Sequence, residues 1–400
     1  MTDQLFALRV DQLHDGHRFL PGNDHLVVIA DGAILDVGPA GVLGSKYAAL
    51  PTVRHHRGVL TPGWIDSHAH TTLPGDGSTI EDVAPLPFQD RVRIAAKNLE
   101  QHLIGGVTTV RDLGAHLDFL AWQPNPQTMP RLLRYGMPIT ADRGHMHWFG
   151  GAISATRTTA DVARDNLRAG ADGLKLVGSG GGTAGTIPHQ ATLSVDQLRA
   201  AVDVGHALGR RSTVHALSNE AILRAVQSGA DGIEHVGFLT ADGDSVLDAH
   251  ALAVALEAGV TFGSTLGCNE AYLHRPGVTG TEGHREQRER TDYYQHNAGR
   301  LVKAGARIAV GSDAGWKHTP FGQFGRELHL LARTGLSSEQ IIHLATVGNS
   351  RALAARGVTG QVSPGHPADL VVIDSVDFAS GPPQVLDVVV GGFRRRSGTL

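Results

Sequence analysis

Several apolar segments of the chain end in side chains that can bind a metal ion. These side chains are His68, His70, His215, His235 and Asp313. His68 and His70 are two residues apart, so the alternation of a strand points both imidazoles to one side, where they can hold one ion. A carboxylate directly after an apolar strand, as at Asp313, is a good metal ligand or base. Each residue alone could be a hydrogen-bonded core or surface group, so only their combination indicates a metal-dependent reaction.

A lysine interrupts a further apolar segment, which reads Gly-Leu-Lys-Leu-Val over residues 173–177. An ammonium group is costly to bury unless it is paired or discharged. Lys175 therefore predicts either a chemical role or an edge strand from which its side chain reaches outward to solvent. The segment alone leaves both alternatives open.

The elements that must position these side chains are alternating apolar runs and capped helices between residues 59 and 357. The predicted strands end near His70, Arg111, Thr140, Lys175, His215, His235, Thr265 and Asp313. Eight βα units predict an α/β fold, a (β/α)8 TIM barrel, whose chemistry lies at the carboxyl ends of the strands. The competing doubly wound sheet is disfavoured, because no G-x-G-x-x-G follows the first strand.

Both ends of the chain are rich in predicted strands. The turn Asp31-Gly32 lies between two β-branched runs and predicts a hairpin. We expect residues 1–58 and 358–400 to form one composite small β-sandwich domain beside the barrel of residues 59–357. Helices are predicted after Ser194 and Ser337, which open capping boxes. Two long connections, 71–90 and 267–295, are expected to hang over the barrel mouth as loops, where they could act as lids.

The composition excludes several classes of protein. The chain has 400 residues, with 35 Lys and Arg against 39 Asp and Glu, and this balance disfavours nucleic acid as a partner. No apolar stretch approaches the roughly 20 residues of a membrane helix. The single cysteine, Cys268, excludes an intrachain disulfide, and no signal peptide is visible, so we expect a cytoplasmic location. A homo-oligomer is an alternative that the sequence leaves open.

The motifs together resemble the amidohydrolase superfamily, especially its imidazolonepropionase- and prolidase-like members. The resemblance spans nearly the whole length. It is carried by the motifs Thr-Pro-Gly-Trp-Ile-Asp-Ser-His-Ala-His at 61–70, Thr-Val-Arg-Asp-Leu-Gly at 109–114, Gly-Ala-Asp-Gly-Leu-Lys at 170–175, Gly-Ile-Glu-His at 232–235, Gly-Ser-Asp at 311–313 and Gly-His-Pro-Ala-Asp-Leu at 365–370.

This resemblance implies a binuclear metal centre. His68, His70 and Asp313 would hold the more buried ion and His215 and His235 the other. Lys175, carboxylated to a carbamate, would bridge the two. The ligand types suit Zn²⁺, with Mn²⁺, Co²⁺ or Fe²⁺ as alternatives. By the same resemblance, Asp313 moves the proton of a metal-activated hydroxide, and His145 polarises the substrate carbonyl.

The substrate pocket is less defined by the motifs. We expect its walls to come from Arg143, His147, Trp148, Trp316, Lys317 and His318, although solvated loops would explain the charged members almost as well. His147 could equally be an inert loop residue. Dipeptidases of this group often carry a tyrosine just after the fifth-strand histidine to bind the substrate carboxylate. His215 is instead followed by Ala-Leu-Ser, so Arg143, Lys317 or Arg275 could replace it, or the substrate could be larger or cyclic.

The resemblance implies hydrolysis of a carbon–nitrogen bond in a peptide, amide or cyclic amide or amidine-like substrate. A peptidase or a peptide-tailoring enzyme of secondary metabolism is the narrower expectation. A lactonase or phosphotriesterase could use the same metal centre and is the alternative. A catalytically dead scaffold that binds small molecules is disfavoured, because all six expected ligand positions are filled.

Overall fold

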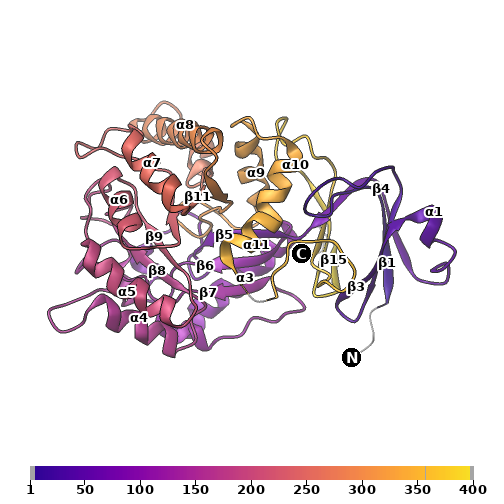
Figure 1. Cartoon of the computed structure of the whole chain (residues 1–400), viewed down its shortest axis with the longest axis horizontal. Coiled ribbons are helices and arrows are strands. Elements are labelled where there is room, and N and C mark those ends of the chain that lie inside the picture. Colours follow the sequence, from indigo (N-terminus) through magenta and orange to yellow (C-terminus); the bar gives the residue numbers. More distant parts are fainter. Residues whose placement is uncertain (1–4, 356, 397–400) are drawn as a thin grey trace.

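A computed structural model describes residues 5–355 and 357–396, and parallel strands alternate with helices along most of this chain (Figure 1). The parallel strands are β5 (Trp64–Ala69), β6 (Val107–Asp112), β7 (Arg131–Arg134), β8 (Leu174–Val177), β9 (Ser212–His215), β10 (Gly232–Glu234), β11 (Thr261–Gly263) and β12 (Arg307–Ala309). They form one sheet in the order β5-β6-β7 and another in the order β12-β11-β10-β9-β8. Strands that follow one another in the sequence thus lie side by side.

Backbone hydrogen bonds connect the two sheets at both edges. On one side the N–H of Ile139, which follows β7, donates to the carbonyl of Lys175 in β8 at 2.9 Å. On the other side the N–H of Ser67 in β5 donates to the carbonyl of Val310, just after β12, at 3.0 Å. The carboxyl ends of all eight strands therefore converge on the same region.

Helices follow the strands on the outside of the sheets (Figure 1). They are α3 (Phe88–Ile104), α4 (Thr159–Arg168), α5 (Val195–Ala207), α6 (Asn219–Gln227), α7 (Ala249–Ala258), α8 (Glu282–Lys303), α9 (Phe324–Ala332) and α10 (Ser338–His343). The predicted capping boxes at Ser194 and Ser337 are confirmed, because each hydroxyl accepts from the backbone N–H three residues on. After β6 the chain forms the 3-10 helix η1 (Leu117–Ala121) in place of an α-helix.

Helix α8 corrects the expectation of a long loop over residues 267–295. Its 22 residues begin after Thr281, whose Oγ1 accepts from the N–H of His284 at 3.2 Å. Most of its residues are polar or charged, so its thin buried face gave no apolar periodicity to recognise. The connection 71–90 likewise contains the short helix α2 (Ile80–Val83) and the start of α3. No helix in the described chain is both long and apolar enough to cross a membrane.

Strands from both termini form a separate lobe. One seven-stranded sheet runs in the order β15-β14-β13-β4-β1-β2-β3, whereas the sequence predicted a sandwich of two sheets. Its strands are β1 (Phe6–Leu13), β2 (His25–Ala30), β3 (Ala33–Pro39), β4 (Thr52–Pro62), β13 (Leu370–Ile373), β14 (Val385–Val390) and β15 (Phe393–Arg396). The predicted hairpin is confirmed, with left-handed φ angles of 50° at Asp31 and 81° at Gly32.

Strand β4 joins the lobe to β5, the strand that carries His68. It pairs parallel with β1 and antiparallel with β13, so the N- and C-terminal strands share one sheet through it. Gly63 then leads directly into β5. A Cβ at Gly63 would lie 2.2 Å from Thr108 Oγ1, so only glycine permits this close approach. The remaining short elements are α1 (Ala40–Leu43), η2 (His147–Phe149), η3 (Glu270–His274), η4 (Leu344–Gly348) and α11 (Asn349–Leu353).

Candidate active site

The six side chains predicted as metal ligands line one pocket at the carboxyl ends of the strands. They are His68, His70, Lys175, His215, His235 and Asp313, and all six are buried. Asp313 Oδ1 lies 3.5 Å from His68 Nε2 and 3.3 Å from His70 Nε2. His215 Nδ1 lies 3.0 Å from His235 Nε2. His68, His235 and Asp313 each offer a ligand atom within 4.8 Å of the others, a spacing that could hold an ion.

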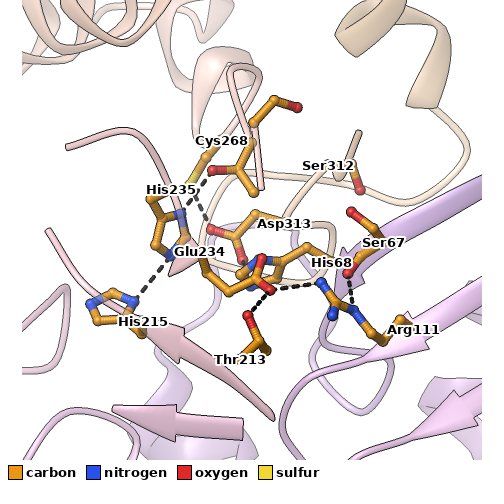
Figure 2. Close-up of polar contacts among 12 residues, drawn as sticks. Ser67, His68, Arg111, Thr213, His215, Glu234, His235, Cys268, Ser312 and Asp313 are labelled. Atoms are coloured by element: carbon orange, nitrogen blue, oxygen red, sulfur yellow. Dashed lines mark hydrogen bonds and ion pairs between the residues drawn. The ribbon is translucent and has the colours of Figure 1, made fainter. Parts of the chain in front are cut away.

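Left-handed backbone turns aim two of these side chains into the pocket. The φ angles are 75° at His235 and 60° at Asp313, a conformation that non-glycine residues rarely adopt. Consecutive side chains of a strand point to opposite faces, but the turn at His235 lets both Glu234 and His235 face inward (Figure 2). Thr265 Oγ1, 2.7 Å from His235 Nδ1, holds the imidazole in place. Such backbone strain, about 1–3 kcal/mol per residue, is typical of functional sites.

A buried carboxylate beneath the pocket orients His68. Glu234 Oε2 lies 2.7 Å from His68 Nδ1, and Oε1 accepts hydrogen bonds of 2.6 Å from both Arg111 Nη2 and Thr213 Oγ1 (Figure 2). Burial alone would raise the pKa of Glu234, but the charges of Arg111 and His68 lower it well below its usual value. The ionised carboxylate accepts the proton of His68 Nδ1, which leaves the Nε2 lone pair free for an ion.

We expect Glu234→Gln to weaken metal binding about 10–100-fold, because the amide group would direct an N–H against either His68 or Arg111. Chelator competition would measure the affinity, and circular dichroism would verify that the variant is folded. Thr213→Val is the matched control, since it removes one donor to the same carboxylate and leaves its contact with His68. Equal metal affinity in wild type and Glu234→Gln would contradict this role.

A second carboxylate ties the strand of His68 and His70 to the loop of Asp313. Asp66 Oδ1 accepts from the backbone N–H groups of His68 and Ser312, both at 3.0 Å. Its Oδ2 contacts the Ser312 hydroxyl and lies 2.8 Å from His102 Nε2. Because Ser312 precedes Asp313, this carboxylate fixes ligands from the first and last parallel strands relative to each other.

Lys175 is one of several buried side chains in the described chain with a polar atom that lacks a hydrogen-bond partner. Its Nζ has no hydrogen-bond partner among the described residues, although the side chain is only 1% exposed. The alternative of an edge strand with an outward lysine is therefore wrong, since β8 lies between β9 and the segment of Ile139. Burial lowers the pKa of Lys175 to about 8, so the neutral amine is more accessible than it is in an exposed lysine.

The protonation states of His215, His235 and Asp313 suit a metal ion. Burial holds the pKa of His235 well below its usual value and lowers that of His215 to about 3. Burial alone would raise the pKa of Asp313, yet His68 and His70 more than offset it and lower the value to about 2. Neutral imidazoles and an ionised carboxylate are the forms that bind metal.

His145 reaches the same pocket from the loop after β7. Its ring centroid lies 4.5 Å from that of His215 and 5.0 Å from that of Trp316. Its Nδ1 lies 2.7 Å from Thr183 Oγ1, and burial holds the pKa of His145 well below its usual value. The neutral ring lines the pocket beside the predicted ligands.

The structure brings part of the predicted substrate pocket together. Trp316 and Lys317 line it with His145, whereas Arg143, His147, Trp148 and His318 are not among its lining residues. Arg143 is exposed, and His147 Nδ1 lies 3.0 Å from the carbonyl of Gly144 in its own loop. Trp148 packs behind Trp316, with 6.4 Å between their ring centroids, and His318 lies against Arg275 and Tyr272.

Several lining residues escaped the sequence reasoning. They are Met146, Gly182, Leu217, Cys268, Asn269, Arg290 and Tyr294. Cys268 Sγ donates to Asp313 Oδ2 at 3.0 Å, and Arg290 and Tyr294 lie on α8, which the sequence did not reveal as a helix. Glu234 was missed as well, although a charged residue inside the apolar run of β10 is the same signal that identified Lys175.

Comparisons with known proteins agree with these features. The model of the amidohydrolase family matches residues 59–394. Ochratoxinase of Aspergillus niger is 24% identical over 389 residues, covering 88% of this chain and 78% of that protein. Imidazolonepropionase of Salinispora tropica is 25% identical over 403 residues, covering 92% of each chain.

Solved structures share the fold. The crystal structure of a Xaa-Pro dipeptidase with bound methionine superposes with a TM-score of 0.81 and 19% identity, covering 98% of this chain and all of that one. A. niger ochratoxinase superposes with a TM-score of 0.80 and 20% identity, covering all of this chain and 97% of that one. The resemblance predicted from the motifs is confirmed: the chain belongs to the amidohydrolase family and is a hydrolase that acts on carbon–nitrogen bonds.

Proposed function

We propose that the chain is a metal-dependent amidohydrolase that cleaves the C–N bond of a peptide, an amide or a cyclic amide or amidine. One observation carries this proposal: six buried ligand-type side chains from five strands line a single pocket. The names of its relatives, imidazolonepropionase and ochratoxinase, and of the dipeptidase with the same fold support this substrate range. A peptidase or peptide-tailoring enzyme of secondary metabolism is the narrower form of the proposal.

The donor set fits two divalent ions. His68, His70 and Asp313 would hold one, His215 and His235 the other, and Lys175 as a carbamate would lie between them. The unpartnered Nζ of Lys175 supports this assignment, because a buried amine without a partner gains one when it becomes an anionic ligand. Zn²⁺ suits imidazole and carboxylate ligands, with Mn²⁺, Co²⁺ or Fe²⁺ as alternatives. Bound ions would supply Lewis acidity and lower the pKa of water.

Two residues of the chain, Asp313 and His145, would then transfer the proton and polarise the carbonyl. Asp313 would accept the proton of the attacking water and pass it to the leaving nitrogen, and its lowered pKa keeps it available as a base. His145 would donate a hydrogen bond to the carbonyl oxygen as negative charge develops there. Met146, Leu217 and Trp316 would exclude solvent from the substrate.

The proposal also includes the domain architecture of the chain. We take the two connected sheets as one closed (β/α)8 barrel, residues 59–357, with a composite lobe from residues 1–58 and 358–400. Residues 1–4, 356 and 397–400 lie outside the described chain. A cytoplasmic location and a small-molecule or peptide substrate, rather than nucleic acid, complete the proposal.

We expect the protein, loaded at neutral pH, to hold about two divalent ions and to hydrolyse at least one class of amide, with activity lost on chelation and restored by metal. Elemental analysis would count the ions. The substrate panel would contain dipeptides, N-acyl amino acids and cyclic amides, with lactones and phosphotriesters as separate arms. Turnover of lactones or phosphotriesters alone would replace the proposal by its alternative. A folded protein without bound metal would refute both.

A further inference from the structure

Two cationic side chains line the mouth of the pocket without a carboxylate partner. Arg290 Nη2 contacts Cys268 Sγ at 3.4 Å, and neither Arg290 nor Lys317 forms an ion pair with any described residue. Both side chains are exposed although they line the pocket. Among the described lining residues Asp313 is the only carboxylate, and it lies on the floor with His68 and His70.

We propose that Arg290 and Lys317 bind an anionic group of the substrate, a carboxylate, above the scissile bond; this inference rests on the proposed function. The guanidinium of Arg290 lies 5.7 Å from the ring centroid of Tyr294, a cation–π contact that restricts its orientation. A thiol is a weak acceptor, so most guanidinium donors stay available for a two-pronged contact with a carboxylate.

Apart from these cations and the predicted metal ligands, the other described lining residues are uncharged, and Asn269, Tyr294 and Cys268 are the polar ones beside His145. Leu217, the lining residue that follows β9, is apolar, and so are Met146 and Trp316. Gly182 keeps space beside Lys317, because a Cβ there would lie 3.3 Å from its Nζ and 3.1 Å from Trp316. An apolar body with one negative end is the ligand that this pocket complements.

The test compares N-benzoyl amino acids with their primary carboxamides on metal-loaded protein, by calorimetric binding and by turnover. We expect Arg290→Gln to raise the dissociation constant and KM of the acids about 10-fold relative to those of the carboxamides, because one charged contact is lost. Arg288→Gln is the control, since it removes an exposed charge from the same helix outside the pocket.

The outcomes separate this inference from the proposed function. Acids and carboxamides that bind alike, or an Arg290→Gln variant that weakens both equally, would overturn the carboxylate site while amide hydrolysis stands. Absence of amide hydrolysis with full metal loading would overturn the proposed function. Selective binding of the acids that depends on Arg290 supports the site in either case.

The contact between His145 and Thr183 supports a separate inference. Thr183 Oγ1 accepts a hydrogen bond of 3.1 Å from the N–H of Met146 and lies 2.7 Å from His145 Nδ1. The described contacts give the hydroxyl hydrogen no other acceptor, so we assign it as the donor to Nδ1. The proton of the neutral ring then resides on Nε2.

We infer that Thr183 is a positioning residue, which makes His145 a hydrogen-bond donor toward the substrate rather than a base. Gly181 keeps the space at this nitrogen free, because a Cβ there would lie 2.7 Å from His145 Nε2. A donor at that position can stabilise a developing oxyanion, whereas a lone pair would repel it.

Thr183→Val, which keeps the shape and removes the hydroxyl, should lower kcat about 10-fold with little change in KM, and Thr183→Ser should keep wild-type kcat. Nitrogen-15 NMR of the histidine rings should show the Nε2-protonated form of His145 in wild type and its loss in Thr183→Val. Unchanged kcat in Thr183→Val, or a proton on Nδ1 in wild type, would overturn the assignment.

Discussion

Lys175→Arg is expected to lose turnover and to retain at most one of the two ions. A guanidinium keeps its charge at every accessible pH and cannot take up CO₂, so the variant would place a permanent cation beside two dications. The wild-type amine can react, because burial lowers the pKa of Lys175 to about 8 and no described residue pairs with it. Elemental analysis and amide turnover would measure both effects.

Lys175→Ala is the informative companion of this variant. It also removes the proposed bridging ligand, but it leaves a gap in which a short carboxylic acid plus metal could restore part of the activity. Rescue of Lys175→Ala but not of Lys175→Arg would identify the missing group as an anion. Wild-type metal content and turnover in Lys175→Arg would refute both the carbamate and the binuclear centre, leaving at most one ion on His68, His70 and Asp313.

Asp313→Asn is expected to reduce turnover at least about 10²-fold while most metal stays bound, because an amide oxygen can still face an ion but cannot take up the proton. The neighbouring contacts favour retention of the fold, since the carboxylate of Asp66, rather than Asp313, holds the loop at Ser312. Steady-state kinetics and elemental analysis on the same preparation would separate the two effects.

A near-normal kcat in Asp313→Asn would show that the residue is only a ligand or lies outside the reaction. Cys268→Ala provides a comparison, since it removes the thiol that donates to Asp313 Oδ2 and leaves the carboxylate itself. We expect a smaller effect from it, because His68 and His70 still lie beside the other carboxylate oxygen.

Local signals made part of the fold predictable. The hairpin at Asp31-Gly32 and the capping boxes at Ser194 and Ser337 depend on residues within a few positions of one another, and all three are confirmed. A lobe built from both termini was predicted, but its single sheet was not, because no local signal shows which strands of the two segments pair with each other, as β4 does with β13. Helix α8 was not predicted, because most of its residues are polar or charged and only a narrow face is buried, so the sequence shows no clear apolar periodicity.

The candidate site was also predictable only in part. The two-residue period of a strand predicted the common direction of His68 and His70, and the family motifs indicated the other four residues, which the structure brings into the same pocket. The charge of Glu234 inside the apolar run of β10 marked it as unusual, but its partner His68, like the contact of Thr183 with His145, depends on the fold and could not be predicted. Local sequence predicts the position and direction of a side chain on its strand. It does not predict which residue from a distant part of the chain that side chain contacts.

The direct connection between β4 and β5 also affects how the protein folds during translation. The strand that carries His68 and His70 follows directly from β4, whose edge is paired by β13. A ribosome that adds about 5–20 residues per second delivers β13 roughly 300 residues after β5, so this edge waits on the order of 15–60 s for its partner. During translation the edge of β4 that later pairs with β13 is thus unpaired and can pair with strands of other chains until the C-terminal strands arrive.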